Sequence, residues 1–179
     1  MEATANANFL VRKNVNITFK AYFIDAMGSM AFGLFASLLI GTILGTIGTE
    51  LSQEWLVEIA NFAKASVGAA MGASIATALV APPLVMFSAI TVGFAGNSLG
   101  GPVGAFIASI VAVEVGKLVS KETKIDIIVT PTVTIIIGVL VANVTGPFVS
   151  SIMTSIGTII NVSTELEPLL MGVIVAVVV

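Results

Sequence analysis

The sequence predicts an all-α fold: a polytopic helical membrane protein with about six hydrophobic segments, two interfacial amphipathic helices and a glycine-rich break. Hydrophobic residues make up 57% of the 179 residues and charged residues only 9%, against roughly 45–50% and about 25% in a soluble domain. The mean hydropathy of +1.12 points the same way. This number of charged side chains is too small to cover the surface of a soluble protein of this size. We therefore expect the lipid bilayer to cover much of the surface.

The residues that are missing exclude most enzyme classes. The chain has no Cys and no His, and it therefore lacks thiol nucleophiles, imidazole bases and the usual transition-metal ligands. A net charge of −3 with no basic face argues against nucleic-acid binding. Any mechanism must therefore use carboxylates, lysines, hydroxyls, amides and backbone groups, or consist of binding and movement rather than chemistry. We expect no catalytic residue, no metal and no cofactor, and an enzyme is the least favoured class.

The first half of the chain divides into a polar lead and two spans. Residues 1–20 are expected to be a cytoplasmic N-terminal segment, and residues 21–179 a single helical transmembrane domain. The first span covers about 22–48. Residues 50–61 place apolar and acidic side chains on different faces, which predicts a helix lying in the membrane interface. The second span covers about 62–80.

Two GxxxG motifs lie in these spans. Gly41 and Gly45 belong to the first span, and Gly68 and Gly72 to the second. Small residues at this spacing allow membrane helices to approach closely. We therefore expect both pairs at helix–helix contacts, within the chain or across a dimer.

A third and a fourth span flank a glycine-rich stretch. Pro82-Pro83 ends the second span. The third span, about 84–95, is short, and the fourth covers 103–119. Residues 96–102 between them favour a re-entrant or broken element and an ordinary tight loop about equally.

The last third predicts two further spans and a second amphipathic helix. The fifth span covers about 127–144 and is expected to end at Gly146-Pro147. Residues 148–162 read as an interfacial or weakly inserted helix. The sixth span, 168–179, would be about 18 Å long, short of the roughly 30 Å hydrocarbon core. We therefore expect the chain to be the N-terminal half of a longer protein.

The basic residues predict the orientation. Three cations lie in the first 20 residues and three more in 117–124, and the span count places both groups on one side. The positive-inside rule assigns that side to the cytoplasm. The acidic residues of segment 50–58 then face outward.

Several acids are candidates for a functional or structural role. Glu114 lies three residues before Lys117 on one helix face, which favours a salt bridge, although a contact to a substrate path remains the alternative. Asp25 is expected to mark the membrane end of its helix. Glu165 and Glu167 either favour the positive start of the sixth span or accept hydrogen bonds from sugar hydroxyls.

A resemblance to a known family rests on several motifs. The stretch Gly68–Lys121 and its continuation resemble the membrane component, enzyme IIC, of phosphotransferase-system sugar transporters, most closely the stand-alone branch that includes the perfringolysin regulator. The motifs that carry the resemblance are Ala81-Pro82-Pro83, GNSLGGPVGAF at 96–106, EVGKL at 114–118, KIDIIVTP at 124–131 and TELEP at 164–168.

The resemblance implies a bacterial membrane subunit, commonly a homodimer, that binds and translocates a sugar. A separate cytoplasmic IIB-type phosphocarrier would phosphorylate the sugar, since this chain has neither of the phosphoryl-carrying residue types. The resemblance points to Glu165 and Asn97 as substrate-binding residues. The alternative function is an IIC-like membrane regulator or sensor without transport.

Overall fold

The computed structural model describes residues 9–164, and all regular elements within this range are helices. The predicted all-α class is confirmed. The first long helix, Lys20–Glu50, has 31 residues and contains two π-helical stretches. Its consecutive parts are η1 (Lys20–Ala26), α2 (Met27–Leu34), η2 (Phe35–Leu39) and α3 (Ile40–Glu50). Within η2, the Ser37 hydroxyl donates a hydrogen bond to the carbonyl oxygen of Gly33 at 2.7 Å.

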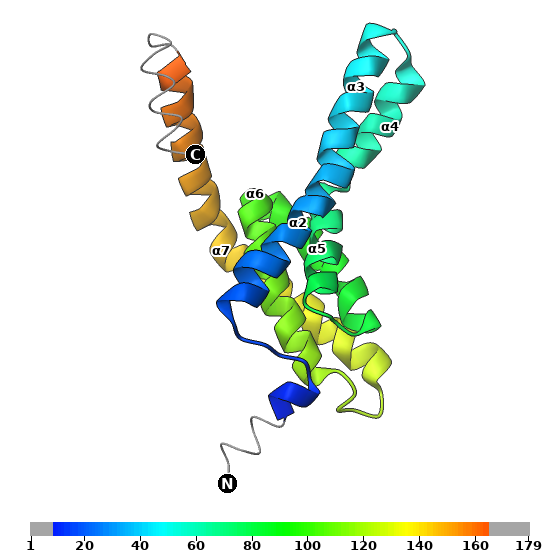
Figure 1. Cartoon of the computed structure of the whole chain (residues 1–179), viewed down its shortest axis with the longest axis vertical. Coiled ribbons are helices and arrows are strands. Elements are labelled where there is room, and N and C mark those ends of the chain that lie inside the picture. The colour runs from blue at the N-terminus through cyan, green and yellow to red at the C-terminus, as the bar shows by residue number, and fades with distance from the viewer. Residues whose placement is uncertain (1–8, 165–179) are drawn as a thin grey trace.

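Two shorter helices return along this first helix. They are α4 (Glu54–Ala65) and α5 (Val67–Ala78), which Ser66 separates with a non-helical φ of −84° and ψ of 1°. The amphipathic segment predicted for the membrane interface forms most of α4 and packs along α3 (Figure 1). Glycines on the first helix make this close approach possible, because a Cβ at Gly41 would lie 3.0 Å from the Ala60 carbonyl oxygen.

The second GxxxG pair also lies where it was expected. A Cβ at Gly68 would meet the carbonyl oxygen of Gly93 at 2.7 Å, and one at Gly72 would collide with the carbonyl oxygen of Ala89. Both partners belong to α6 (Pro83–Val119). The prediction that these glycines form helix–helix contacts is confirmed for both pairs within the chain.

Helix α6 consists of two arms that fold back on each other. Its helical geometry breaks at Gly100 (φ −144°, ψ 20°) and Gly101 (φ 61°, ψ −159°), and the positive φ suits glycine because it has no side chain. Contacts across the arms show that they are antiparallel. Gly96 approaches Ala105, and Gly116 approaches Val85. The arms match the third and fourth predicted spans, and the glycine-rich stretch makes a tight reversal.

The last described helix is α7 (Asp126–Thr164), whose 39 residues extend about 58 Å. The predicted end at Gly146-Pro147 is wrong, because α7 continues through both residues. The segment 148–162, expected as a separate interfacial helix, is its second half. In apolar surroundings a helix satisfies its own backbone, so losing one N–H at a proline costs less than leaving the helical form. The sixth span, 168–179, lies outside the described residues.

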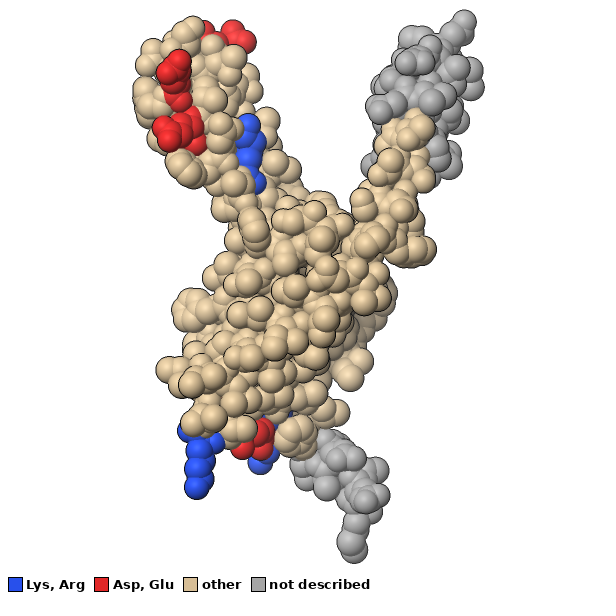
Figure 2. All heavy atoms as spheres, turned by 180° about the vertical axis from the view of Figure 1, so that it is seen from behind, with Lys and Arg blue, Asp and Glu red and all other residues tan. Residues whose placement is uncertain are grey.

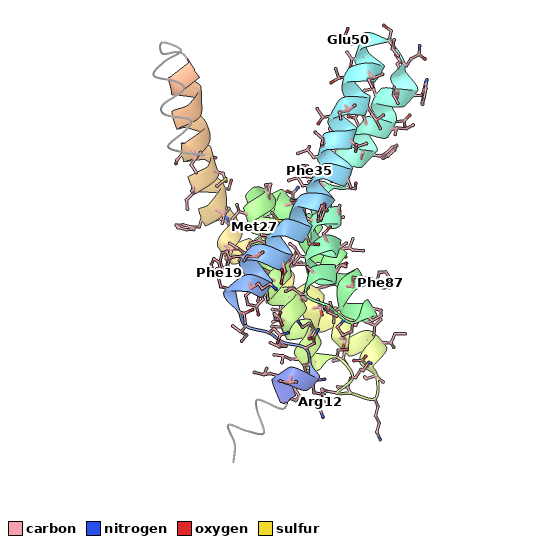
Figure 3. The ribbon with its side chains drawn as sticks, in the orientation of Figure 1. Arg12, Phe19, Met27, Phe35, Glu50 and Phe87 are labelled. Carbon is pink, nitrogen blue, oxygen red and sulfur yellow. The ribbon has the colours of Figure 1, made fainter. Side chains whose placement is uncertain are left out.

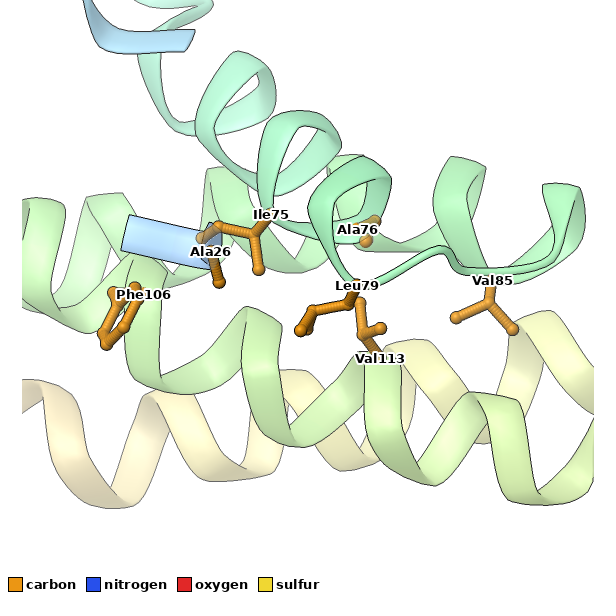
Figure 4. Close-up of a cluster of buried hydrophobic side chains, with 8 residues drawn as sticks. Ala26, Ile75, Ala76, Leu79, Val85, Phe106 and Val113 are labelled. Atoms are coloured by element: carbon orange, nitrogen blue, oxygen red, sulfur yellow. The ribbon is translucent and has the colours of Figure 1, made fainter. Parts of the chain in front are cut away.

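The helices pack around a core near one end of the molecule. The core joins η1, α5 and both arms of α6 (Figure 4), through the side chains of Ala26, Ile75, Ala76, Leu79, Val85, Ala89, Phe106 and Val113. The first half of α7 packs along α6. The α3–α4 pair and the second half of α7 extend beyond the α6 hairpin as two separate arms (Figure 1).

Three of the described helices are long and apolar enough to cross a membrane: Lys20–Glu50, Pro83–Val119 and Asp126–Thr158. Since Pro83–Val119 is folded in two, each of its arms is only about 25 Å long. Charged side chains gather at the two ends of the molecule, and the surface between them is uncharged on the face in Figure 2. Arg12 and Glu50 lie at these opposite ends (Figure 3). This distribution is that of a membrane protein.

Candidate functional site

A polar cleft lies at the end of the molecule that carries Arg12. It has a volume of about 510 Å³, and its wall comes from the N-terminal segment, the α5–α6 turn and the α6–α7 turn. The charged residues that line it are Arg12, Lys13, Lys117, Lys121 and Glu122. A smaller cavity of about 200 Å³ adjoins it and shares Asn14, Val80 and Lys117. The polar residues that only the smaller cavity contacts are Asn16, Asp25 and Glu114.

Lys117 stands between the two cavities and is almost fully buried, with 1% of its side chain exposed. Its Nζ donates hydrogen bonds of 3.1 Å to the Leu79 carbonyl oxygen and to Glu114 Oε1. The predicted Glu114–Lys117 salt bridge is therefore confirmed. Nζ also lies 3.1 Å from Oε2, so both carboxylate oxygens of Glu114 face the buried ammonium group.

The α5–α6 turn supplies the carbonyl group that Lys117 binds. Helix α5 ends just before Leu79, where carbonyl groups have no partner within the helix. Val80 follows with a φ of 52°, a strained conformation for a β-branched residue. Pro83 then begins α6, where a missing N–H does no harm. The strained turn holds the Leu79 carbonyl group toward the buried ammonium group.

The N-terminal segment is fastened to the α6–α7 turn by ion pairs. The carboxylate of Glu122 contacts Lys13 Nζ and, at 3.2 Å, an Arg12 guanidinium nitrogen. The hydrogen bond from Lys13 is the main reason that the pKa of Glu122 lies below its usual value of 4.5, and the positive charges of Lys13 and Arg12 add to this effect. Lys13 also donates to the Ser120 carbonyl oxygen. Arg12, Lys13 and Asn14 of the predicted cytoplasmic segment therefore form one wall of the cleft.

The start of α7 completes this end of the molecule. Asp126 Oδ1 accepts hydrogen bonds from the backbone N–H of Lys121 at 2.7 Å and from the Thr130 hydroxyl. Lys121 has a φ of 63°, and the carboxylate of Asp126 stabilises this turn. The lysine side chain is exposed and lines the larger cavity.

Of the two residues predicted to bind substrate, Asn97 does not line either cavity. Asn97 lies near the tip of the α6 hairpin and faces α5, because a Cβ added at Gly68 would lie 2.6 Å from the Asn97 Cβ. About fourteen residues of helix, roughly 21 Å, separate it from the start of α6 at the cleft. Glu165 lies outside the described residues. Asp25, expected only to mark a helix end, lines the smaller cavity.

The site also contains residues that sequence reasoning did not select. Asn14, Asn16 and Glu122 were not candidates, and Arg12 and Lys13 were used only to orient the chain. The available signal was that both basic clusters were predicted on the same side of the membrane. That prediction implied a shared basic surface, although it did not indicate a cleft.

The side chains in the cleft can bind a polar ligand. Within residues 9–164 no group of three or more Asp or Glu residues could hold a metal ion. Carboxylates, amides and ammonium groups can together bind hydroxyl groups and anions. The geometry is that of a polar binding site at one end of an apolar helical domain.

Comparisons with known proteins connect this architecture to one family. The family model described as "Phosphotransferase system, EIIC" matches residues 24–179. Searches of the curated proteins and of the solved structures found no match. Because the family match covers well over half of the chain, the chain belongs to the EIIC family, the membrane components of the phosphotransferase system.

Proposed function

We propose that this membrane component binds a sugar and moves it across the bacterial cytoplasmic membrane for phosphorylation by a separate cytoplasmic partner. The observation that carries the proposal is the EIIC match over residues 24–179. The partner is a IIB-type phosphocarrier, because the chain has no His or Cys to carry a phosphoryl group itself. The functional unit is a homodimer.

The charge distribution supports an orientation for this transport. Four cations line the polar cleft, whereas three exposed glutamates, Glu50, Glu54 and Glu58, lie at or near the far ends of α3 and α4. The positive-inside rule places the cleft and residues 1–20 in the cytoplasm. Residues 21–179 then form the transmembrane domain, and the cleft faces the compartment of the phosphocarrier.

The proposed sugar contacts are Glu165 and Asn97. Asn97 lies beside the reversal of α6 at Gly100 and Gly101, where helical hydrogen bonding is interrupted. Backbone groups at such breaks are free to join side chains in binding a substrate. Its amide group can both donate to and accept from sugar hydroxyls.

Uptake of a panel of radiolabelled sugars by bacteria that express the intact protein with a IIB partner tests this proposal. We expect uptake of at least one sugar, accompanied by its phosphorylation, and a loss of most uptake in Asn97→Ala and Glu165→Gln. Asn61→Ala removes a similar amide from an exposed position on α4 and serves as the control.

Normal uptake by well-expressed Asn97→Ala and Glu165→Gln variants would remove these residues from the site. If the intact protein changes gene expression but takes up none of the sugars, the regulator function is correct instead.

A further inference from the structure

A groove between α3 and α4 carries a cation near one end and an acid at the other. Its volume is about 310 Å³, and Lys64 and Glu50 are the only charged residues that line it. No ion pair among residues 9–164 includes either of them. Both charges are therefore available to a ligand in the groove.

The glycines of α3 leave room for the Lys64 side chain to lie along the groove. A Cβ added at Gly41 would lie 2.8 Å from Lys64 Cγ, and one added at Gly45 would lie 3.5 Å from Lys64 Nζ. The side chain therefore runs along α3 in the direction of Glu50, and its ammonium group lies beside Gly45. Five residues of helix, about 8 Å, separate Gly45 from Glu50, so a small group fits between the two charges.

The Lys64 ammonium group lies at the depth of lipid headgroups. Lys20 and Gly45 belong to the same long helix, and the 25 residues between these positions extend about 38 Å. The hydrocarbon core of a bilayer measures about 30 Å, or about 40–45 Å with both headgroup regions. When Lys20 lies in one headgroup region, the Lys64 ammonium group therefore lies in the other. The exposed apolar side chains between them, such as Phe32 and Phe35, face the acyl chains.

The threonines of the groove determine which polar groups a ligand must bring. The hydroxyl groups of Thr42, Thr46 and Thr49 donate hydrogen bonds to carbonyl oxygens four residues earlier, at 2.7, 3.1 and 2.8 Å. Each hydroxyl oxygen can then only accept further hydrogen bonds, as the Glu50 carboxylate does. This end of the groove favours a cationic group with several N–H donors, whereas Lys64 favours an anion.

We propose that the groove binds the headgroup of a zwitterionic phospholipid with a primary ammonium group, such as phosphatidylethanolamine. The phosphate contacts Lys64 Nζ, and the ammonium group donates to Glu50 and to the threonine oxygens. The acyl chains follow the apolar surface of the first helix toward Lys20. Opposite charges at both ends select this lipid over an anionic one, whose headgroup has no cation for Glu50. This inference goes beyond the proposed function, because the lipid site requires neither a sugar nor the phosphocarrier.

Native mass spectrometry of the purified intact protein in neutral detergent tests the proposal. Phosphatidylethanolamine, phosphatidylcholine and phosphatidylglycerol with identical acyl chains are titrated separately. We expect the first lipid to bind at least about threefold more tightly than either of the others. Phosphatidylcholine keeps the positive charge but has no N–H donor, and phosphatidylglycerol has no cation. If either lipid binds as tightly as phosphatidylethanolamine, the proposed headgroup is wrong.

Variants locate the binding. Lys64→Met should weaken phosphatidylethanolamine about fivefold, and methionine keeps an unbranched apolar chain against α3. Glu50→Gln should remove the preference for phosphatidylethanolamine over phosphatidylcholine. Lys124→Gln and Glu58→Gln are the matched controls, because each loses the same charge from an exposed position that does not line the groove. An equal effect in a variant and its control would refute the site.

Two further measurements separate this lipid site from other uses of the two charges. We expect Lys64→Met and Glu50→Gln to keep the Tm of the wild type in lipid-free detergent. If both variants lower the Tm equally, the two side chains pair with each other and the lipid site is wrong. Glycerophosphoethanolamine, the headgroup without acyl chains, should not displace the lipid at equal concentration. If it does, the ligand is a soluble molecule instead.

Discussion

Replacing Gly72 by alanine tests whether the contact between α5 and α6 depends on the absence of a side chain. A Cβ at this position would collide with the carbonyl oxygen of Ala89 and would lie 3.0 Å from the Gly93 Cα. Both obstacles are backbone atoms, which cannot rotate away, so the helices must separate. Overpacking of this kind destabilises by about 1–3 kcal/mol, and the better helix propensity of alanine offsets at most about 1 kcal/mol.

The assay is thermal unfolding of the purified protein in detergent. For a chain of this length, 1 kcal/mol corresponds to about 2–4 °C in Tm, and the expected decrease is several degrees. Gly28→Ala is the control, because Gly28 is also helical and a Cβ there meets no atom within 4 Å. That variant should keep or raise the Tm. Equal Tm values for both variants would refute the packing argument.

Three further predictions concern the charged residues and the orientation. Lys117→Met should destabilise the fold by about 3–5 kcal/mol, because the carboxylate of Glu114 is left buried without its partner; adding Glu114→Gln should recover most of the lost Tm. The lowered pKa of Glu122 means that its ion pairs stabilise the fold above its usual pKa of 4.5 and are lost as the pH falls through the lowered value, so Tm measured between pH 6 and pH 3 should decline more in the wild type than in Glu122→Gln. An impermeant thiol reagent should label Gln53→Cys and spare Thr123→Cys in intact cells, both sites being exposed, and the reverse labelling would contradict the proposed orientation.

The α6 hairpin could be predicted from sequence because its ends are encoded locally. Pro82-Pro83 starts the first arm, and Gly100-Gly101 reverses the chain without help from distant residues. The same reasoning failed at Pro147. A proline ends a helix readily where water can take up the freed backbone groups, but an apolar environment offers no such substitute.

The placement of α4 and of the cleft could not be predicted, because both depend on partners far away in the sequence. The predicted apolar face of α4 is exposed at Trp55, Ile59 and Phe62. The glycines of α3 instead pack against the face that carries Val57 and Ala60, and the sequence of α4 alone does not single out this face. The cleft likewise combines the N-terminal segment with two turns. Its cations were visible as local clusters, but their convergence on Glu122 is a tertiary property.

The π-helical stretch η2 determines which side of the first helix faces inward. Gly33 contacts α5, and Gly41 and Gly48 contact α4, so all three must point to the same side. Seven residues complete about two α-helical turns, which suits the interval from 41 to 48. The interval from 33 to 41 is one residue longer, and the wider π turns absorb that extra residue. The π-helical stretch η2 thus restores the helical register, so that the three glycines lie on one face of the first helix. An insertion or deletion of one residue within η2 changes only the width of the π-helical turn. The same insertion or deletion within α3 would rotate the α3 glycines away from α4 by about 100°.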